Sequence, residues 1–436
     1  MAEVLPLRGV RYNPSVSGPL ALLVSPPYDV IDGPMRAMLA AQSPYAFVEL
    51  DLPESAGGDK YAEAGERFRS WLAAGVMLEE EAPSFYLYWQ RFRGPDGAEV
   101  LRKGFLGLTR LHAYDDKVVL PHERTLSGPK ADRLALMEAT EAQLSQIFLL
   151  YSDPEGTVDR ALEAATTQPP ILDMRTSDGV HHQVWVMQDP SAIATVSARL
   201  ATERLLIADG HHRYETALGY ARERGLLGGS EPGSFTLAFF ANADDPGLVV
   251  LPTHRGLHDV AGFNAEAWLS RAAELFDLAP LDGAADPDGW LARLRDAGAA
   301  GPAFILATNS GGTLRGTLAT LNRARAAAEQ ATMEGVAEMA ELDVAILHEL
   351  LLERRAGITR EAQAAKTNIY YYKDASEALE DLSTGRTQAA VFMNGTPVAK
   401  VRAICEAGDF MPQKSTFFFP KVLSGVVLHD LRTGRG

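Results

Sequence analysis

Short apolar runs alternate along the chain with longer amphipathic stretches, which predicts an α/β protein with mixed (α+β) sheets. Runs rich in β-branched and aromatic residues predict strands, and apolar residues three or four positions apart predict helices with one buried face. Strands are expected at residues 20–24, 85–92, 100–111, 147–151, 182–187, 205–209, 235–241, 248–251, 303–307, 314–318 and 389–393. Helices are expected near residues 35–41, 60–74, 130–144, 265–276, 289–297 and 344–354, whereas residues 397–407 fit either a helix or a paired strand.

Length and charge narrow the range of partners. A chain of 436 residues is long for one hydrophobic core, so two or three domains are expected. The formal net charge is −16, with 57 acidic against 41 basic residues. This balance disfavours nucleic acid and anionic membranes as partners and leaves a small-molecule substrate as the expectation. The oligomeric state is not indicated by the sequence.

The single cysteine and the N-terminal residues indicate where in the cell the protein is expected. Cys405 has no second cysteine with which to form a disulfide or a metal cluster, and it fits a small buried side chain. Residues 1–10 lack the basic start and apolar centre of a signal peptide, and no apolar run reaches the roughly 18 residues of a spanning helix. We therefore expect a cytoplasmic protein.

One stretch combines a strand, a turn and a helix with cationic side chains. An apolar run ends at Asp209, Gly210 predicts a turn, and a helix follows from His211, His212 and Arg213. A helix N-terminus carries partial positive charge, and an Arg fork suits phosphate geometry. This corner therefore predicts a phosphate site. The alternative is an ordinary polar cap at the rim of a core.

Two further loops carry candidate chemistry. His122 and Glu123 follow an apolar run, so Glu123 could act as general base or metal ligand; from these residues alone a surface ion pair with Arg124 or Arg133 is favoured. Near the C-terminus, a loop with one Lys and two hydroxyl side chains could hold a phosphate or a carboxylate, although the glycine-rich run of a P-loop is missing. This loop contains Lys414, Ser415 and Thr416.

Two other segments leave their role open. A proline-stiffened loop presents Tyr28 and Asp29, which could face a ligand, while Asp29 could equally cap the helix near residue 35. His254 and Arg255 form a second cationic cluster at a strand end. This cluster could bind an anion or merely solvate a loop.

Taken together, these motifs resemble two families. In this order, His122-Glu123, Asp209 to Arg213 and Lys414 to Thr416 resemble the free-serine kinase family, which is built on the ParB/sulfiredoxin-like fold. Nearly the whole chain also resembles a bacterial and archaeal family of unknown function. The residues that carry the second resemblance are Ser25-Pro26-Pro27-Tyr28-Asp29-Val30, His122-Glu123, Asp209-Gly210-His211-His212-Arg213 and Met411-Pro412-Gln413-Lys414-Ser415-Thr416.

The resemblance to the kinase family implies a role for each residue of the three motifs. It implies Glu123 as general base beside His122, Asp209 near Mg²⁺, and ADP or ATP as the nucleotide. Its phosphate-binding residues would be Gly210, His211, His212 and Arg213, with Lys414, Ser415 and Thr416 on substrate or product phosphate. For the whole chain we expect an N-terminal mixed α/β module (1–110), which the kinase resemblance does not match, a ParB/sulfiredoxin-like core (111–258) and a C-terminal α/β domain (259–436). The function implied is phosphoryl transfer to a small hydroxyl-bearing metabolite; the alternatives are a ParB-like nucleotide switch and a nucleotide hydrolase without an acceptor.

Overall fold

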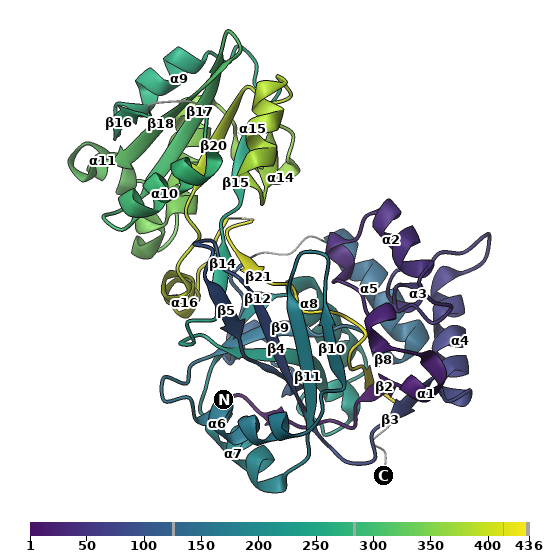
Figure 1. The fold of residues 1–436 in the computed structure, drawn as a ribbon. Helices are drawn as coiled ribbons and strands as arrows, with labels where there is room; N and C mark the ends of the chain where they lie inside the picture. The colour runs from purple at the N-terminus through teal and green to yellow at the C-terminus, as the bar shows by residue number, and fades with distance from the viewer. Residues whose placement is uncertain (124–126, 282–284, 413, 433–436) are drawn as a thin grey trace. The chain divides into compact units, whose positions relative to one another are not determined.

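The structure, a computed structural model, describes residues 1–123, 127–281, 285–412 and 414–432, and the chain folds into two compact units (Figure 1). Unit 1 comprises Met1–Pro121, Thr125–Val249 and Phe418–Gly436, and unit 2 comprises His122–Arg124 and Val250–Phe417. Each unit combines β-sheet and helices, which confirms the predicted α/β class. The three-part division expected from the sequence stays a prediction, and so does the ParB/sulfiredoxin-like core.

A ten-stranded sheet organises unit 1. Its strands run in the order β10-β11-β4-β6-β13-β9-β12-β7, with β1 beside β6 and β5 beside β4. The sheet is mixed, because β13 and β9 pair in parallel, as do β12 and β7, while the other pairs are antiparallel. The strands are Val4–Leu5 (β1), Phe85–Arg93 (β4), Glu99–Arg102 (β5), Phe105–Arg110 (β6), Val119–Leu120 (β7), Ile147–Tyr151 (β9), Leu172–Arg175 (β10), His181–Met187 (β11), Leu205–Asp209 (β12) and Phe235–Asn242 (β13). Two small sheets pair Val10–Tyr12 (β2) with Met77–Glu79 (β3) and Ala142–Gln143 (β8) with His429–Asp430 (β22).

Helices pack against this sheet, and every second side chain of its strands contributes to the core between them. The side chains of Ile147, Leu149 and Tyr151 share one core with Ile207 and with Tyr214. Successive side chains of a strand point to opposite faces, so this odd-numbered set defines the face that packs against helices. The helices of unit 1 are Pro14–Ser17 (α1), Gly33–Ala40 (α2), Val48–Asp51 (α3), Lys60–Ala73 (α4), Ser127–Thr140 (α5), Thr157–Leu162 (α6), Pro190–Leu200 (α7) and His211–Glu223 (α8).

Unit 2 has its own sheet and core. Six antiparallel strands run in the order β16-β18-β17-β20-β15-β19. The strands are His254–Leu257 (β15), Phe276–Pro280 (β16), Ala303–Ser310 (β17), Thr313–Leu321 (β18), Ile369–Tyr372 (β19) and Ala389–Met393 (β20). The helices are Ala265–Ala272 (α9), Pro287–Gly298 (α10), Arg323–Gln330 (α11), Asp343–Ile346 (α12), Arg354–Ala356 (α13), Arg360–Ala365 (α14), Ala375–Ser383 (α15) and Val398–Glu406 (α16), and Leu347–Glu353 (η7) is a π-helix. Val249–Leu251 (β14) and Phe417–Phe419 (β21) lie where the chain passes from one unit to the other.

One face of the unit 2 sheet is covered by α10 and α15. Ile305 of β17 packs with Leu294 of α10 and Leu382 of α15 in one core. Figure 1 shows both helices against this sheet. Unit 2 therefore has a hydrophobic core made entirely from its own residues.

Several sequence expectations were wrong in detail. Residues 20–24 were expected as a strand, but Leu20–Leu22 (η1) is a 3₁₀-helix, because the carbonyl of Pro19 accepts a hydrogen bond from the Leu22 amide and closes a turn. The helix near residue 35 is capped by Asp32 and not by Asp29: the Asp32 carboxylate accepts from the Met35 amide at 2.8 Å.

The helix expected at 130–144 also ends early. It stops at Thr140, because Glu141 adopts a left-handed conformation with φ 50° and the next two residues form strand β8. Residues 397–407, which left two readings open, contain helix α16. Cys405 is buried, as expected, and burial raises the pKa of its thiol to about 12.

Within the described part of the chain, none of the helices has both the length and the apolar composition needed to span a bilayer.

Candidate functional site

The strand-to-helix corner predicted at Asp209 exists as expected. Strand β12 ends at Asp209, Gly210 turns with φ 89°, and α8 begins at His211. A positive φ of this size favours glycine, and a Cβ at this position would lie 2.9 Å from Nε of Arg213. The guanidinium of Arg213 is therefore packed directly against the turn. Gly210 has no side chain that could cap α8, so the cap that an Asp or Ser would supply is missing at this helix start.

Asp209 is the centre of a charged cluster in unit 1. Its carboxylate accepts a hydrogen bond from Arg213 at 2.6 Å and another from Lys421 at 2.5 Å. Burial alone would raise the pKa of Asp209, but the charges of Lys421 and Arg213 hold this pKa well below its usual value. The carboxylate is therefore ionised and held between two cations. Arg213 also donates to the backbone carbonyl of Gln146, which fixes its orientation.

A third cation belongs to the same cluster. Arg102 at the end of β5 is fully buried and donates to Gln90 and to the carbonyl of Pro420, the residue before Lys421. Burial lowers the pKa of Arg102 to about 9, although the negative charge of Asp209 opposes this shift. Its guanidinium lies 4.9 Å from the ring centre of Phe148. The Nη1 atom is buried and finds no hydrogen-bond acceptor among the described residues. Three cations thus gather around one carboxylate.

The proline-stiffened loop lies close to this cluster. Arg133 is 4.3 Å from the ring centre of Tyr28, and it forms ion pairs with Asp51 at 3.0 Å and with Asp132 at 2.6 Å. Burial raises the pKa of the Tyr28 hydroxyl, with Arg213 as the first of the charges that oppose the shift. A cavity of about 50 Å³ is lined by Asp51, Arg133 and Arg213, which is room for solvent and not for a metabolite.

In unit 2 the structure brings together two motifs that lie far apart in the sequence. His122 is buried, its carbonyl accepts a hydrogen bond of 2.8 Å from the Met411 amide, and its Nε2 shares a hydrogen bond of 2.9 Å with the hydroxyl of Thr416. Glu123, the next residue, is half-buried. The His122-Glu123 loop is therefore anchored to the Lys414-Ser415-Thr416 loop, as a shared site requires.

Contacts within the Lys414-Ser415-Thr416 loop and with neighbouring residues hold this loop in place. Lys414 adopts φ 58° and its side chain is exposed, while its carbonyl accepts from Arg255 at 3.1 Å. Ser415 is buried; its hydroxyl donates to the Pro412 carbonyl, and its own carbonyl accepts from Thr396 at 2.9 Å. The hydroxyl of Ser415 thus closes the loop, and Lys414 is the charged side chain that the loop presents.

The surroundings of Arg255 decide between the two interpretations of its cationic cluster. Arg255 is fully buried and donates to His348 and to the carbonyls of Thr253 and Lys414, so a solvated loop is the wrong interpretation of this cluster. Burial lowers the pKa of Arg255 to about 10. Arg124, one of the two partners considered for Glu123, lies outside the described residues.

The predicted site residues therefore fall into two groups. Asp209, Gly210, His211, His212 and Arg213 lie in unit 1, whereas His122, Glu123, Lys414, Ser415 and Thr416 lie in unit 2. The roles assigned to these residues remain predictions. Sequence reasoning missed Lys421, Arg102 and His348. Only Lys421 had a signal, as the single basic residue after an apolar run, while the other two are recognisable only from their contacts.

The residues around Asp209 were tested against the Mg²⁺ ion that the resemblance implies. Both carboxylate oxygens already accept hydrogen bonds from cations. Mg²⁺ binds carboxylate oxygens at roughly 2.1 Å and would lie beside both positive charges. Among the described residues, no group of three or more His, Cys, Asp or Glu side chains is arranged to hold a metal. In this arrangement Asp209 does not fit a magnesium ligand.

The fold and the two residue groups define a two-unit α/β protein with a cation-rich strand-to-helix corner. The chain belongs to the family described as Protein of unknown function (DUF1015), whose profile matches residues 4–345. This match confirms the resemblance to a family of unknown function. No protein with a curated functional record matches the chain.

Several solved structures show a distant likeness. A conserved hypothetical protein from Pyrococcus furiosus shares 13% identity over 71% of this chain and 91% of its own, with a TM-score of 0.33. A mutant free serine kinase in complex with ADP shares 12% identity over 70% of this chain and 84% of its own, with a TM-score of 0.33. SbnI from Staphylococcus aureus, with a C-terminal truncation, shares 10% identity over 76% of this chain and 90% of its own, with a TM-score of 0.35. The family match, and not these likenesses, identifies the chain.

Proposed function

We propose that this chain is a nucleotide-dependent phosphotransferase that acts on a small hydroxyl-bearing metabolite. The observation that carries the proposal is the cation-rich start of α8, where Arg213 and Lys421 contact Asp209 behind the Gly210 turn. Two cations on one carboxylate leave a local positive charge within a chain of net charge −16. Such a helix start favours a phosphate group.

Phosphoryl transfer fits these residues chemically. The reaction needs positioning and neutralisation of phosphate charge more than covalent chemistry from the protein. In the proposal, the first backbone amides of α8 and the side chains of His211, His212 and Arg213 hold the phosphates of ADP or ATP. Lys421 and Arg102 add positive charge behind them. Asp209 orients Arg213 and Lys421 and does not touch the nucleotide.

The acceptor side of the proposal rests on the anchored loop of unit 2. The contacts of His122 with Met411 and Thr416 fix the backbone from which Glu123 projects. A half-buried carboxylate on a fixed loop suits a general base. In the proposed step it takes the proton from the acceptor hydroxyl as that oxygen attacks the terminal phosphorus, and the bond from this phosphorus to the nucleotide breaks, releasing ADP from ATP or AMP from ADP. Lys414 then neutralises charge on the product phosphate. The motif resemblance, and no contact in the structure, supplies the expectation of a serine-like acceptor.

The first experiment separates the proposal from its two rivals. The full chain is incubated with γ-labelled ATP or β-labelled ADP and a panel of small hydroxyl compounds, and products are identified by ³¹P NMR. A phosphorylated acceptor supports the phosphotransferase. Free phosphate alone, at a rate independent of the panel, would favour a hydrolase, and nucleotide retained without turnover would favour a switch.

A carboxylate variant tests the assigned base. Glu123→Gln is expected to lower turnover by about 10²- to 10⁴-fold, because it removes the proton acceptor, while nucleotide affinity by calorimetry stays within about twofold. Glu406→Gln, an exposed carboxylate at the end of α16, is the matched control and is expected to retain full activity. If Glu123→Gln lost nucleotide binding together with turnover, the role of base would be withdrawn.

A further inference from the structure

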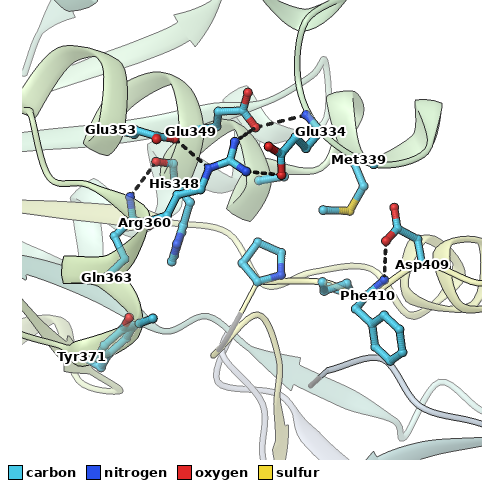
Figure 2. A pocket seen from close by; sticks show the side chains of 15 residues that line it. Glu334, Met339, His348, Glu349, Glu353, Arg360, Gln363, Tyr371, Asp409 and Phe410 are labelled. Atoms are coloured by element: carbon cyan, nitrogen blue, oxygen red, sulfur yellow. Dashed lines mark hydrogen bonds and ion pairs between the residues drawn. The ribbon is translucent and has the colours of Figure 1, made fainter. Parts of the chain in front are cut away.

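A cavity of about 390 Å³ lies wholly within unit 2, and none of its described lining residues is one of the predicted site residues. Its wall is formed by the π-helix η7, by α14, by the segment before η6 (Ala337–Glu341) and by residues 409–412. A volume of this size is typical of pockets for small molecules. In Figure 2 the charged side chains gather at the top of the view, with Tyr371 and Phe410 below them.

The π-helix shapes this cavity. It spans the seven residues Leu347–Glu353, and both His348 and Glu349 line the cavity although each is only 9% exposed. π-Helical turns are rare and occur frequently at functional sites. Here the π-helix places one imidazole and two carboxylates on the cavity wall: His348, Glu349 and Glu353.

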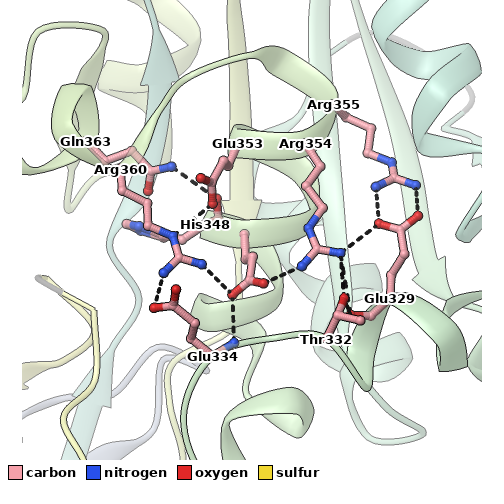
Figure 3. A network of polar contacts seen from close by, with 10 residues as sticks. Glu329, Thr332, Glu334, His348, Glu353, Arg354, Arg355, Arg360 and Gln363 are labelled. Atoms are coloured by element: carbon pink, nitrogen blue, oxygen red, sulfur yellow. Dashed lines mark hydrogen bonds and ion pairs between the residues drawn. The ribbon is translucent and has the colours of Figure 1, made fainter.

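The wall is negatively charged. Among the residues that the structure describes, Glu334, Glu349, Glu353 and Asp409 line the cavity together with one cation, Arg360. Arg360 contacts Glu334, and it pairs with Glu349 at 3.1 Å and with Glu353 at 3.0 Å (Figure 3).

Neighbouring ion pairs reduce this charge without cancelling it. Arg354 binds Glu349 at 2.5 Å and Glu329 at 3.3 Å, and Arg355 also binds Glu329. In the ion-pair network five glutamates face the three guanidinium groups of Arg354, Arg355 and Arg360, so two negative charges remain, and Asp409 on the wall adds a third. The five are Glu274, Glu329, Glu334, Glu349 and Glu353. Burial, together with the charge of Arg255, lowers the pKa of His348 to about 3, so His348 adds no positive charge at neutral pH.

Much of the remaining lining is apolar. Met339, Ala345, Phe410 and Met411 belong to it, together with the ring of Tyr371. Methionine side chains adapt to small apolar groups, and the ring of Tyr371 already lies 4.6 Å from the guanidinium of Arg255. The wall as a whole therefore suits a small molecule with a short carbon skeleton and a positive charge.

The cavity is connected to the loop that carries the candidate base. Met411 lines the cavity, and its amide donates to the His122 carbonyl at 2.8 Å. Arg255 donates both to His348 on the cavity wall and to the carbonyl of Lys414. The wall, the His122-Glu123 loop and the Lys414 loop therefore share their supporting contacts within one unit.

We propose that this cavity binds the acceptor, and that the acceptor is a hydroxyl compound that carries an ammonium group and no carboxylate. This inference rests on the proposed function, because only phosphoryl transfer gives the bound compound the role of acceptor. The binding site itself depends only on the cavity and its charge. A zwitterionic amino acid would bring its carboxylate against a wall that already has excess negative charge, whereas an amino alcohol would place its ammonium group there.

The test compares three compounds of similar size by calorimetry with the full chain: ethanolamine, serine and ethylene glycol. We expect ethanolamine to bind at least about tenfold more tightly than either of the others, since a charged hydrogen bond in a partly enclosed site contributes on that scale. Equal binding of serine and ethanolamine, or no binding of ethanolamine, would overturn the assigned class.

Variants locate the binding site. Glu349→Gln is expected to weaken ethanolamine binding about tenfold, and Glu353→Gln, at a less buried position, serves as a second variant in case the first disturbs the ion-pair network. Glu406→Gln is the control outside the cavity, and circular dichroism with thermal unfolding checks that each variant is folded. Unchanged affinity in both folded cavity variants would overturn the proposal.

The two proposals fail in different ways. Ethanolamine that binds in the cavity, without a phosphorylated product when nucleotide is present, would remove the kinase function and leave the cavity assignment standing. Turnover of another acceptor that persists at the wild-type rate in Glu349→Gln and Glu353→Gln would remove the cavity as acceptor site and leave the kinase function standing.

Discussion

At the residue scale, Asp209 organises the charged cluster of unit 1. It holds Arg213 and Lys421 through both carboxylate oxygens, and its side chain is only 19% exposed. Removing one member of a buried ion pair leaves the other charges without compensation. Asp209 thus contributes to stability as well as to the orientation of the cations.

Asp209→Asn is expected to lower the free energy of unfolding at pH 7 by about 3 kcal/mol. Because the folded-state pKa of Asp209 lies below its unfolded value, its contribution is fully present above about pH 4 and is lost as the pH falls further. Urea unfolding of wild type and variant between pH 7 and pH 2.5 should therefore show two stabilities that converge in acid. A constant difference at all pH values would contradict this assignment.

The residues of this cluster differ in how far the sequence revealed them. Asp209, Gly210 and Arg213 were predictable, because they are adjacent at a strand-to-helix boundary. Lys421 gave only the weak signal of a basic residue after an apolar run, and Arg102 gave none, because both reach the cluster from distant segments: Lys421 lies 212 residues from Asp209, and Arg102 lies on β5, which pairs with β4. Tertiary pairing of this kind has no local pattern in the sequence.

At the element scale, the sequence predicted the regular strands and helices well, but it did not predict the irregular π-helix. Most long strands and amphipathic helices lie near their expected residues, because each has one buried face that fixes its period. Residues 344–354 were expected as an amphipathic helix, but most of that segment is the π-helix η7. A π-helix has nearly the same apolar pattern as an α-helix, so the sequence could not reveal the turn that shapes the cavity.

Substitution by alanine is expected to have opposite effects on stability at two glycines, Gly210 just before α8 and Gly219 within it. Gly210→Ala is expected to destabilise the protein by about 1–2 kcal/mol or more, since φ is 89° and the new Cβ would meet Arg213. Gly219→Ala, in the middle of α8 with no atom within 4 Å of the added Cβ, is expected to stabilise it by about 0.5–1 kcal/mol. Chemical denaturation of both variants measures the two signs, and a stabilising Gly210→Ala would refute the described turn.

At the scale of the whole molecule, each unit has a hydrophobic core of its own. Leu149 belongs to a core of unit 1 and Leu382 to the core of unit 2, and both are fully buried. Cores that share no residues support separate cooperative transitions. The sequence predicted more than one domain from length alone, but it could not show that unit 2 takes residues 122–124 from within the sequence of unit 1.

Calorimetric unfolding is therefore expected to show more than one transition. Leu149→Ala and Leu382→Ala each remove a buried side chain, at a cost of about 2–5 kcal/mol, and each should lower the midpoint of a different transition. A single transition that both variants shift equally would show that the two cores unfold together.

The hydrogen bond between His122 and Thr416 can form only late in synthesis of the chain by the ribosome. The two residues are 294 positions apart, so at about 5–20 residues per second the ribosome completes Thr416 some 15–60 s after His122. During that interval the loop with the candidate base has neither of its two anchors, Met411 and Thr416. A chain that terminates before residue 411 therefore contains every residue up to the α8 corner, yet lacks the contacts that hold Glu123 in place.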